Sequence, residues 1–155
     1  MASRIDSKLK ELGIELPEGV APAANYVPYV ITGNLVVISG QICKWQGEMK
    51  YKGKLGKDLS VEQGKDAAKI CMLNVLSQLK HACGGNLDKV ARCVRLGIFV
   101  NCTDSFTEQP GVGNGASDLV VEIFGDKGRH ARAAIGCNSL PLDTAVEVEA
   151  IFELN

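Results

Sequence analysis

The strongest chemical signal in this chain is a lone arginine followed by an acidic pair near the C-terminus. Arg132 lies in a strand-like run of small and apolar residues, and Glu147 and Glu149 lie in the next such run. A guanidinium is always charged, and its planar set of N–H donors matches a carboxylate, so Arg132 needs an anionic partner. We therefore expect that a glutamate neutralises it across two adjacent strands, or that an anionic ligand does.

The other candidate groups give weaker signals. The six cysteines form no Cys-x-x-Cys pair, and the chain has only two histidines. This pattern predicts reduced, mostly buried thiols, no disulfide and no bound metal. The glycine-rich segment 111–115 lacks the lysine and hydroxyl residue of a P-loop, so we do not expect it to bind phosphate.

Length and composition favour one globular domain. The chain has 155 residues, of which 46% are hydrophobic, and a formal net charge of −1. We expect a single domain over residues 1–155, with residues 1–21 as an N-terminal helical extension. The charge gives no basic surface for nucleic acid, no apolar run approaches the length of a membrane span, and the opening residues lack an apolar leader segment. These features predict a cytoplasmic protein that binds neither nucleic acid nor membrane.

The periodicity of apolar residues predicts an α+β fold. A short helix should end at Gly13, a long helix should follow the capping box at Ser60 and end before Gly84, and a third helix should cover 114–124. Strands are expected at 26–31, 35–41, 90–102, 131–139 and 145–154, the last two as a closing pair, with a tight turn between the first two. This order predicts one mixed sheet with helices on one face.

The last predicted strand has two contrasting faces. Val146, Val148 and alternate residues after them are apolar, whereas Glu147, Glu149 and Glu153 lie on the other face. A sheet covered by helices on one side leaves this second face open to solvent or to another molecule. We therefore expect the chain to form an oligomer.

Several separated segments resemble one known family. The segments 33–41 (Gly-Asn-Leu-Val-Val-Ile-Ser-Gly-Gln), 131–134 (Ala-Arg-Ala-Ala), 140–141 (Leu-Pro) and 146–150 (Val-Glu-Val-Glu-Ala) are similar to those of the Rid (YjgF/L-PSP) family of reactive-intermediate deaminases. The similarity covers roughly 22–154. The resemblance implies a chorismate-mutase-like (ferredoxin-like) subunit with a mixed six-stranded sheet, two main helices on one face, and a homotrimer with a ligand cleft at each subunit interface.

The resemblance also implies an activity. Deaminases of this family hydrolyse 2-imino acids and their enamine tautomers, such as 2-aminoacrylate and 2-iminopropanoate, to 2-keto acids and ammonia, without a cofactor or metal. Arg132 matches the arginine that binds the substrate carboxylate, and Glu147 matches the glutamate linked to the attacking water. The expected ligand is thus a small 2-imino or 2-keto carboxylic acid.

Four further residues are implied as substrate-binding. Tyr26 matches a tyrosine that closes the cleft, Asn114 matches an asparagine of the same site, and Gly40 and Ala134 complete the set. Ala134 stands where many family deaminases have a cysteine. Since water attacks the imine directly, the reaction needs no nucleophilic thiol there, and a backbone amide at Ala134 can still contact the ligand.

Simpler readings of the same residues stay open. Arg132 and Glu147 can form a surface ion pair of small value, Tyr26 can be an aromatic at the edge of the core, and Asn114 can be a helix N-cap. His130, two residues before Arg132, can line the same cleft, but a solvated position at a loop end is favoured. Two other functions also stay open, namely a non-catalytic trimer that binds a small carboxylic acid and, less favoured, an endoribonuclease.

Overall fold

The fold is built on a five-stranded sheet. The computed structural model describes residues 2–19 and 24–155. The strand order is β1-β2-β7-β5-β6, in which β5 and β6 are parallel and the other neighbours are antiparallel. The strands are β1 (Tyr29–Thr32), β2 (Leu35–Ile42), β5 (Val90–Asn101), β6 (Ala131–Cys137) and β7 (Val146–Leu154). The predicted α+β class with a mixed sheet is confirmed.

Two details of the predicted sheet are wrong. The sheet has five strands rather than six, because β3 (Lys44–Trp45) and β4 (Glu48–Met49) pair only with each other in a separate small hairpin. The first strand begins at Tyr29 rather than at residue 26. Pro28 precedes it, and a proline cannot donate a hydrogen bond to a neighbouring strand. The predicted tight turn is present, since Thr32 pairs with Leu35 around Gly33 and Asn34.

The last two strands, β6 and β7, are not neighbours, contrary to the prediction from their closeness in sequence. Strand β5 lies between them. The connection passes the end of β5, where Asn101 N–H donates to Ala145 O and Asn101 Nδ2 donates to Asp143 Oδ1. These bonds carry the chain across the end of β5 to the far side of that strand.

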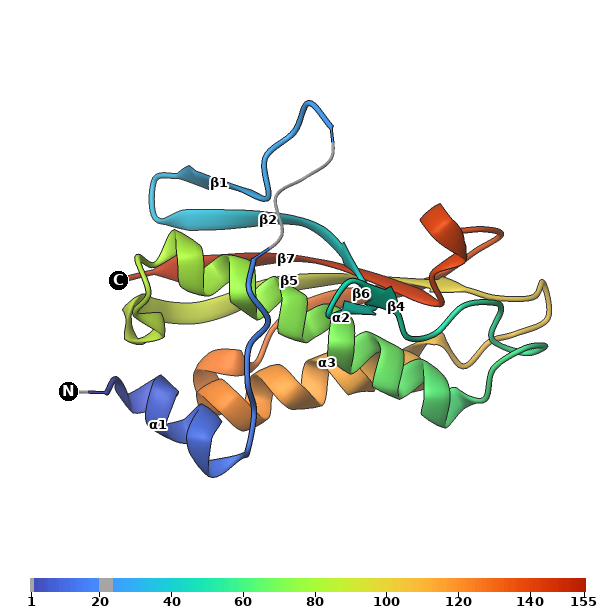
Figure 1. The fold of residues 1–155 in the computed structure, drawn as a ribbon, viewed down its shortest axis with the longest axis horizontal. Helices are drawn as coiled ribbons and strands as arrows, with labels where there is room; N and C mark the ends of the chain where they lie inside the picture. The colour runs from blue at the N-terminus through green and yellow to red at the C-terminus, as the bar shows by residue number, and fades with distance from the viewer. Residues whose placement is uncertain (1, 20–23) are drawn as a thin grey trace.

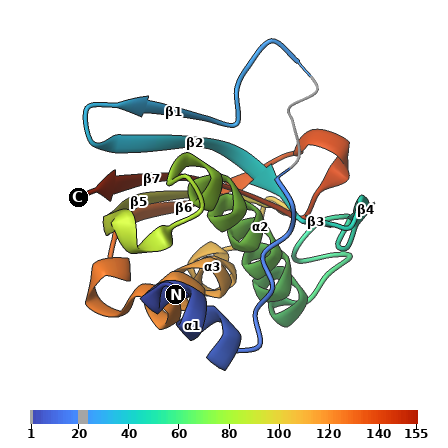
Figure 2. The ribbon, with the colours of Figure 1, turned by 60° about the vertical axis from the view of Figure 1, so that its left-hand side comes forward.

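Three α-helices lie on one side of the sheet; two of them, α2 and α3, cover its face, and the third, α1, packs against α3 (Figures 1 and 2). They are α1 (Arg4–Glu11), α2 (Val61–Ala82) and α3 (Gln109–Phe124), and short 3-10 turns form η1 (Leu87–Lys89), η2 (Gly125–Gly128) and η3 (Pro141–Asp143). The reciprocal capping box of Ser60 and Gln63 begins α2 as predicted. Helix α3 begins at Gln109 rather than at residue 114, because Pro110 is compatible with the first turn, where no N–H is needed.

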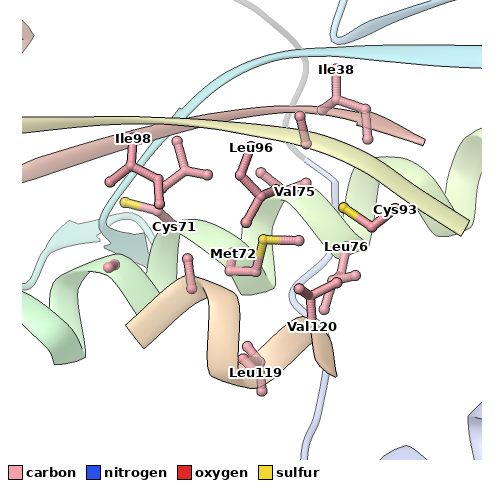
Figure 3. Close-up of a cluster of buried hydrophobic side chains, with 14 of the residues drawn as sticks. Ile38, Cys71, Met72, Val75, Leu76, Cys93, Leu96, Ile98, Leu119 and Val120 are labelled. Carbon is pink, nitrogen blue, oxygen red and sulfur yellow. The ribbon is translucent and has the colours of Figure 1, made fainter. Parts of the chain in front are cut away.

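The core lies between the sheet and the two long helices (Figure 3). Ile38, Leu96 and Ile98 of the sheet and Met72 and Val75 of α2 are at most 1% exposed. Burial of side chains of this size stabilises the fold by about 1.5–3 kcal/mol each. No helix in the described ranges is both long enough and apolar enough to span a bilayer.

The N-terminal helix α1 is fastened to this core by a remote carboxylate. Asp88 in η1 accepts hydrogen bonds from the backbone N–H groups of Arg4 and Ile5, at 2.8 and 2.9 Å. Both bonds lower the pKa of Asp88, and the bond from Ile5 has the larger effect. Lys80 of α2 adds an ion pair with Asp6 at 2.8 Å. The extension is therefore docked on η1 and α2.

Within residues 2–19 and 24–155, no α-helix packs on the opposite face of the sheet (Figures 1 and 2). Val146, Val148, Ala150 and Phe152 point toward the helices and are buried, while Glu147, Glu149, Ile151 and Glu153 are only partly buried, so the predicted alternation along β7 is confirmed. On this open face Val37 and Ile135 are 40% and 48% exposed. Large apolar side chains on an uncovered sheet face are typical of an interaction surface.

Candidate active site

Arg132 lies on the edge strand β6 and points to the helix side of the sheet. It pairs in register with the buried Leu96 of β5. Its Nη1 donates to Asn114 Oδ1 and to Ser117 Oγ, both at 2.9 Å, and its Nη2 donates to Pro110 O at 3.4 Å. All three acceptors belong to α3, where Asn114 and Ser117 follow at helical spacing and so share one face.

The three acceptors are neutral. This decides between the two alternatives for Arg132, namely neutralisation by a glutamate of the same chain or by an anionic ligand. In the described part of the chain no carboxylate lies within ion-pair distance of Arg132, and its Nε–H has no recorded acceptor. The expected ion pair with Glu147 or Glu149 is therefore wrong for the single chain. Both glutamates lie on the opposite face of the sheet, because they alternate with buried residues of β7. The guanidinium is held in place while its charge stays uncompensated.

Asn114 and Ala134 lie beside Arg132. Asn114 is not a helix N-cap, because the helix begins at Gln109, and its side chain instead accepts from Arg132. Gly113 lies next to both residues: a β-carbon added to it would lie at ordinary contact distances of 3.4 Å from Arg132 Nη1 and 3.6 Å from Ala134 Cβ, and closer, at 3.0 Å, to Ile98 Cδ1. We call Arg132, Asn114, Ser117 and Ala134 the arginine group.

Glu147 lies against Gly40 on the open face. Residues 39 and 40 form a bulge in β2, opposite one residue of β7. A β-carbon at position 40 would overlap Oε1 of Glu147, so the carboxylate occupies the space that any other residue would fill. The glycine therefore places the Glu147 carboxylate directly over the backbone of β2.

The environment of Glu147 favours its protonated form. Partial burial is the main cause that raises the pKa of Glu147, and the neighbouring charge of Glu149 raises it further. Glu149 itself has a partner, since Arg95 Nη1 lies 3.4 Å from its Oε1. A raised pKa makes a carboxylate a stronger proton acceptor, which suits a group that takes a proton from water.

Tyr26 lies in the segment before β1, next in sequence to residues that bond to Ser39 in the β2 bulge. It is 56% exposed and precedes β1. The two residues after it are fastened to β2, because Ser39 Oγ donates to Val27 O at 2.7 Å and Ser39 N–H donates to Pro28 O at 3.0 Å. We call Tyr26, Gly40 and Glu147 the glutamate group.

The two groups are far apart within one chain. The arginine group lies at the β6 edge on the helix side, whereas Glu147 lies on the open face and Tyr26 precedes β1 at the other edge. The structure thus brings the sequence-predicted residues together as two sets, not as one site. A single chain cannot place one small ligand against both sets.

Ser117 and His130 belong with the arginine group; Ser117 was not predicted to do so, and for His130 a place in the same cleft was the less favoured alternative. Ser117 Oγ lies 2.9 Å from His130 Nε2, and His130 Nδ1 lies 2.6 Å from Gly128 O. His130 is therefore bonded to protein and is not a solvated loop-end residue. The spacing of Ser117 from Asn114, three residues along a helix, is the signal that points to this role.

The thiols form no part of either group. All six cysteines are unpaired, and five of them are buried, as predicted. Across residues 2–19 and 24–155, no set of three or more His, Cys, Asp and Glu side chains is arranged to hold a metal ion.

Comparison with known proteins assigns the family. Residues 6–154 match the family model described as "YjgF/chorismate_mutase-like, putative endoribonuclease". The chain belongs to the YjgF/chorismate mutase-like (Rid) family. Protein TCP17 of Trypanosoma cruzi is 48% identical over 155 residues, which cover 99% of this chain and 96% of that protein. Both the arginine group and the glutamate group lie inside the region that matches the family.

Solved structures of family members agree with the fold. Atu1372, a protein of unknown function from Agrobacterium tumefaciens, superimposes with a TM-score of 0.91 at 44% identity, over 97% of this chain and 92% of its own. A "putative endoribonuclease" from Shewanella oneidensis superimposes with a TM-score of 0.93 at 40% identity, over 97% and 99%. TdcF of E. coli, solved with bound serine, gives a TM-score of 0.61 at 21% identity over 90% and 93%, which shows a shared fold alone.

Proposed function

We propose that the protein hydrolyses reactive 2-imino acids and their enamine tautomers to 2-keto acids and ammonia. The observation that carries this proposal is the state of Arg132, which is fixed by three neutral acceptors and keeps an uncompensated charge. Nη1 donates two of these bonds and Nη2 donates one. The Nε–H and the second N–H of Nη2 are therefore the donors that we assign to a carboxylate. A charge-assisted hydrogen bond to a carboxylate stabilises a complex by about 1.5–3 kcal/mol.

The chemistry follows from fixing the carboxylate. A 2-imino acid carries its electrophilic C=N carbon next to the carboxylate, so a fixed carboxylate orients that carbon toward one direction. Water adds to the carbon, the nitrogen gains protons, and the C–N bond breaks to release ammonia and leave the 2-keto acid. This sequence needs one group that removes a proton from water and delivers protons to nitrogen.

Glu147 is the group that we assign to proton transfer. Its pKa is raised by burial and by Glu149, which brings a carboxyl closer to the pH at which it can exchange protons in both directions. Gly40 keeps the space in which this carboxylate lies. No thiol is required in this scheme, which agrees with Ala134 in place of the cysteine of many family deaminases.

The proposal requires a homotrimer. One chain separates the arginine group from the glutamate group, so a complete site needs the arginine group of one subunit and the glutamate group of the next. A cyclic trimer in which the open sheet faces are buried provides three such clefts and covers Val37 and Ile135. Tyr26 then belongs to the rim of the cleft, on the side of the glutamate group.

A non-catalytic carboxylate-binding trimer is the second candidate. It is favoured by the fact that Arg132 alone can bind a small carboxylate, whatever Glu147 does. The serine found in TdcF is a molecule with such a carboxylate. Turnover of an imine distinguishes the two candidates, because binding alone produces no keto acid.

The decisive experiment measures the disappearance of 2-iminopropanoate generated in a coupled reaction. Wild-type protein should accelerate it above the background rate. Arg132→Lys keeps the charge but loses the planar pair of donors, so kcat/KM should fall at least about tenfold with an unchanged melting temperature. Arg129→Lys is the matched control, because the exposed Arg129 side chain forms its ion pair with the neighbouring Asp126 on the surface.

The outcomes separate the candidates. No acceleration by the wild type, together with pyruvate binding that depends on Arg132, would support the binding trimer. No acceleration and no carboxylate binding would reject both. Cleavage of RNA by the purified wild type, lost in Arg132→Lys, would instead support the endoribonuclease reading.

A further inference from the structure

We infer that Ser117 and His130 are positioning residues that hold the guanidinium of Arg132 in the orientation in which it binds a carboxylate, an inference that rests on the proposed function. Ser117 Oγ lies 2.9 Å from Arg132 Nη1 and 2.9 Å from His130 Nε2. His130 Nδ1 lies 2.6 Å from Gly128 O. A continuous chain of hydrogen bonds therefore runs from a backbone carbonyl to the candidate carboxylate-binding group.

With a neutral imidazole, the donor and acceptor of every hydrogen bond in this series are fixed. A carbonyl oxygen only accepts, so His130 Nδ1 must carry the hydrogen that it shares with Gly128 O. In the neutral imidazole, Nε2 is then the acceptor, and the Ser117 hydroxyl donates to it. This leaves the lone pairs of Ser117 Oγ for the N–H of Arg132. His130 thus sets the hydroxyl so that it accepts from Arg132.

Gly128, at the far end of this series of hydrogen bonds, is also held in place. Gly128 is buried in η2, and a β-carbon on it would overlap the carbonyl oxygen of Val120 in α3. The turn therefore lies directly on α3, with no side chain between them. Gly128 O, Ser117 and Asn114 all have fixed positions relative to α3, so Arg132 on β6 is oriented by the helix and not by its own strand.

Two substitutions at position 130 test the role of His130 Nε2 as the acceptor of the Ser117 hydroxyl. The amide of His130→Gln can place an oxygen near the position of Nε2, whereas His130→Asn has a side chain that reaches only as far as Nδ1. We expect the dissociation constant of pyruvate to rise about three- to tenfold in His130→Asn and to change less in His130→Gln. Ser117→Ala should match His130→Asn, and Ser117→Thr, which keeps the hydroxyl, should recover most of the affinity.

A double substitution tests whether the effect passes through Arg132. In the Arg132→Lys background, Ser117→Ala should change the dissociation constant of pyruvate by less than about twofold, because the planar group that it positions is absent. Equal effects of Ser117→Ala in both backgrounds would overturn the inference. So would a drop in melting temperature with no loss of pyruvate affinity in Ser117→Ala, which indicates a purely structural role.

A spectroscopic measurement keeps this inference separate from the proposed function. The chain has two histidines, so the ring nitrogens of His130 can be assigned in ¹⁵N-labelled protein with His81→Gln as reference. We expect a protonated Nδ1 and an unprotonated Nε2, and slow rotation of the Arg132 guanidinium that becomes fast in Ser117→Ala and His130→Asn. A protonated Nε2 in neutral His130, or guanidinium rotation that is the same in all three proteins, would overturn the positioning role even if the enzyme is active. Failure of imine hydrolysis with these signals as expected would reject only the proposed reaction.

Discussion

The contact between Gly40 and Glu147 is the most sensitive feature at the scale of single residues. The carboxylate occupies the position that a β-carbon at residue 40 would need. Since the overlapping atom is the end of a flexible side chain, an added methyl group can displace the carboxylate without unfolding the sheet. Residue 40 therefore controls where Glu147 lies.

We predict that Gly40→Ala lowers imine hydrolysis at least about tenfold while the melting temperature changes little. A misplaced carboxylate can no longer take a proton from the attacking water of the proposed reaction, but the bulge in β2 stays intact. The measurement is a double-mutant cycle with Glu147→Ala. In that background Gly40→Ala should have almost no further effect on rate, and additive losses in the two single variants would contradict the prediction.

The raised pKa of Glu147 also predicts a pH-dependent stability. A carboxyl whose folded-state pKa lies above its unfolded value stabilises the fold below the unfolded pKa, and this contribution is lost as the pH rises through the folded pKa. Above that range the half-buried charge is a cost. Glu147→Gln removes the charge, so it should melt at a higher temperature than the wild type at pH 7.5.

Melting curves between pH 4 and pH 7.5 check this expectation. The difference between Glu147→Gln and wild type should shrink as the pH falls. Glu15→Gln, on the exposed connection after α1, provides the control and should show no comparable trend. A difference that stays constant over the whole range would indicate that packing, not charge, distinguishes the two proteins.

At the scale of elements, α3 carries two of the four residues of the arginine group, Asn114 and Ser117, and its position depends on a close approach to α2. A β-carbon on Gly115 would overlap the backbone carbonyl oxygen of Lys65 in α2. The two helix backbones are thus nearly in contact at this point. Asn114 and Ser117 are positioned relative to the sheet by that contact.

We predict opposite effects for two glycine substitutions in the same helix. Gly115→Ala must separate α3 from α2, which should cost about 1–3 kcal/mol and lower the melting temperature by about 2–4 °C per kcal/mol. At Gly111 the nearest atom to an added β-carbon is Val61 Cγ1 at 3.7 Å, an ordinary contact. Gly111→Ala should therefore be neutral or stabilise the fold by up to about 1 kcal/mol. Thermal unfolding of both variants gives the comparison, and equal destabilisation would show that the helix contact is not the cause.

Local sequence signals predicted where helices and strands begin and end better than they predicted which of these elements are neighbours in space. The capping box at Ser60 and the glycines at positions 13 and 125 marked helix ends that the structure has. The start of α3 was missed, because Pro110 and the glycines after it have the composition of a loop. The hairpin of β3 and β4 was missed too, since its turn uses Gln46 with a positive φ of 52° and no Asn-Gly signal.

The candidate site shows the same division. The family resemblance implied one site for Arg132, Asn114 and Ala134, and these three residues lie together in the structure. The pairing of Arg132 with Glu147 failed, because it required β6 and β7 to be neighbours. Strand order depends on contacts remote in sequence, such as that of Asn101 with Asp143, which no local pattern reveals.

At the scale of the whole molecule, the separation of the two groups predicts complementation between defective subunits. In the proposed trimer each cleft takes Arg132 from one subunit and Glu147 from the next. Arg132→Ala and Glu147→Ala trimers should each be inactive. Every mixed ring of the two contains one cleft with both native residues.

Equal amounts of the two variants, unfolded and refolded together, should therefore recover about one quarter of the wild-type activity. Sedimentation verifies that the mixture is trimeric. Refolding either variant alone is the control and should recover none. Absence of activity in a well-formed mixed trimer would mean that one subunit supplies both residues after a rearrangement, or that another pair of residues is used.

The location of Arg132 and Glu147 on opposite faces of the sheet has a consequence for gene dosage. In the proposed trimer each cleft needs both sets of residues, so under this proposal a newly folded chain would be inert until it meets two others. At cellular concentrations near or below the threshold for assembly, the amount of trimer follows the third power of the amount of chain, and halving expression would leave about one eighth of the active form. The cell would then lose protection against reactive imines far more steeply than it loses protein.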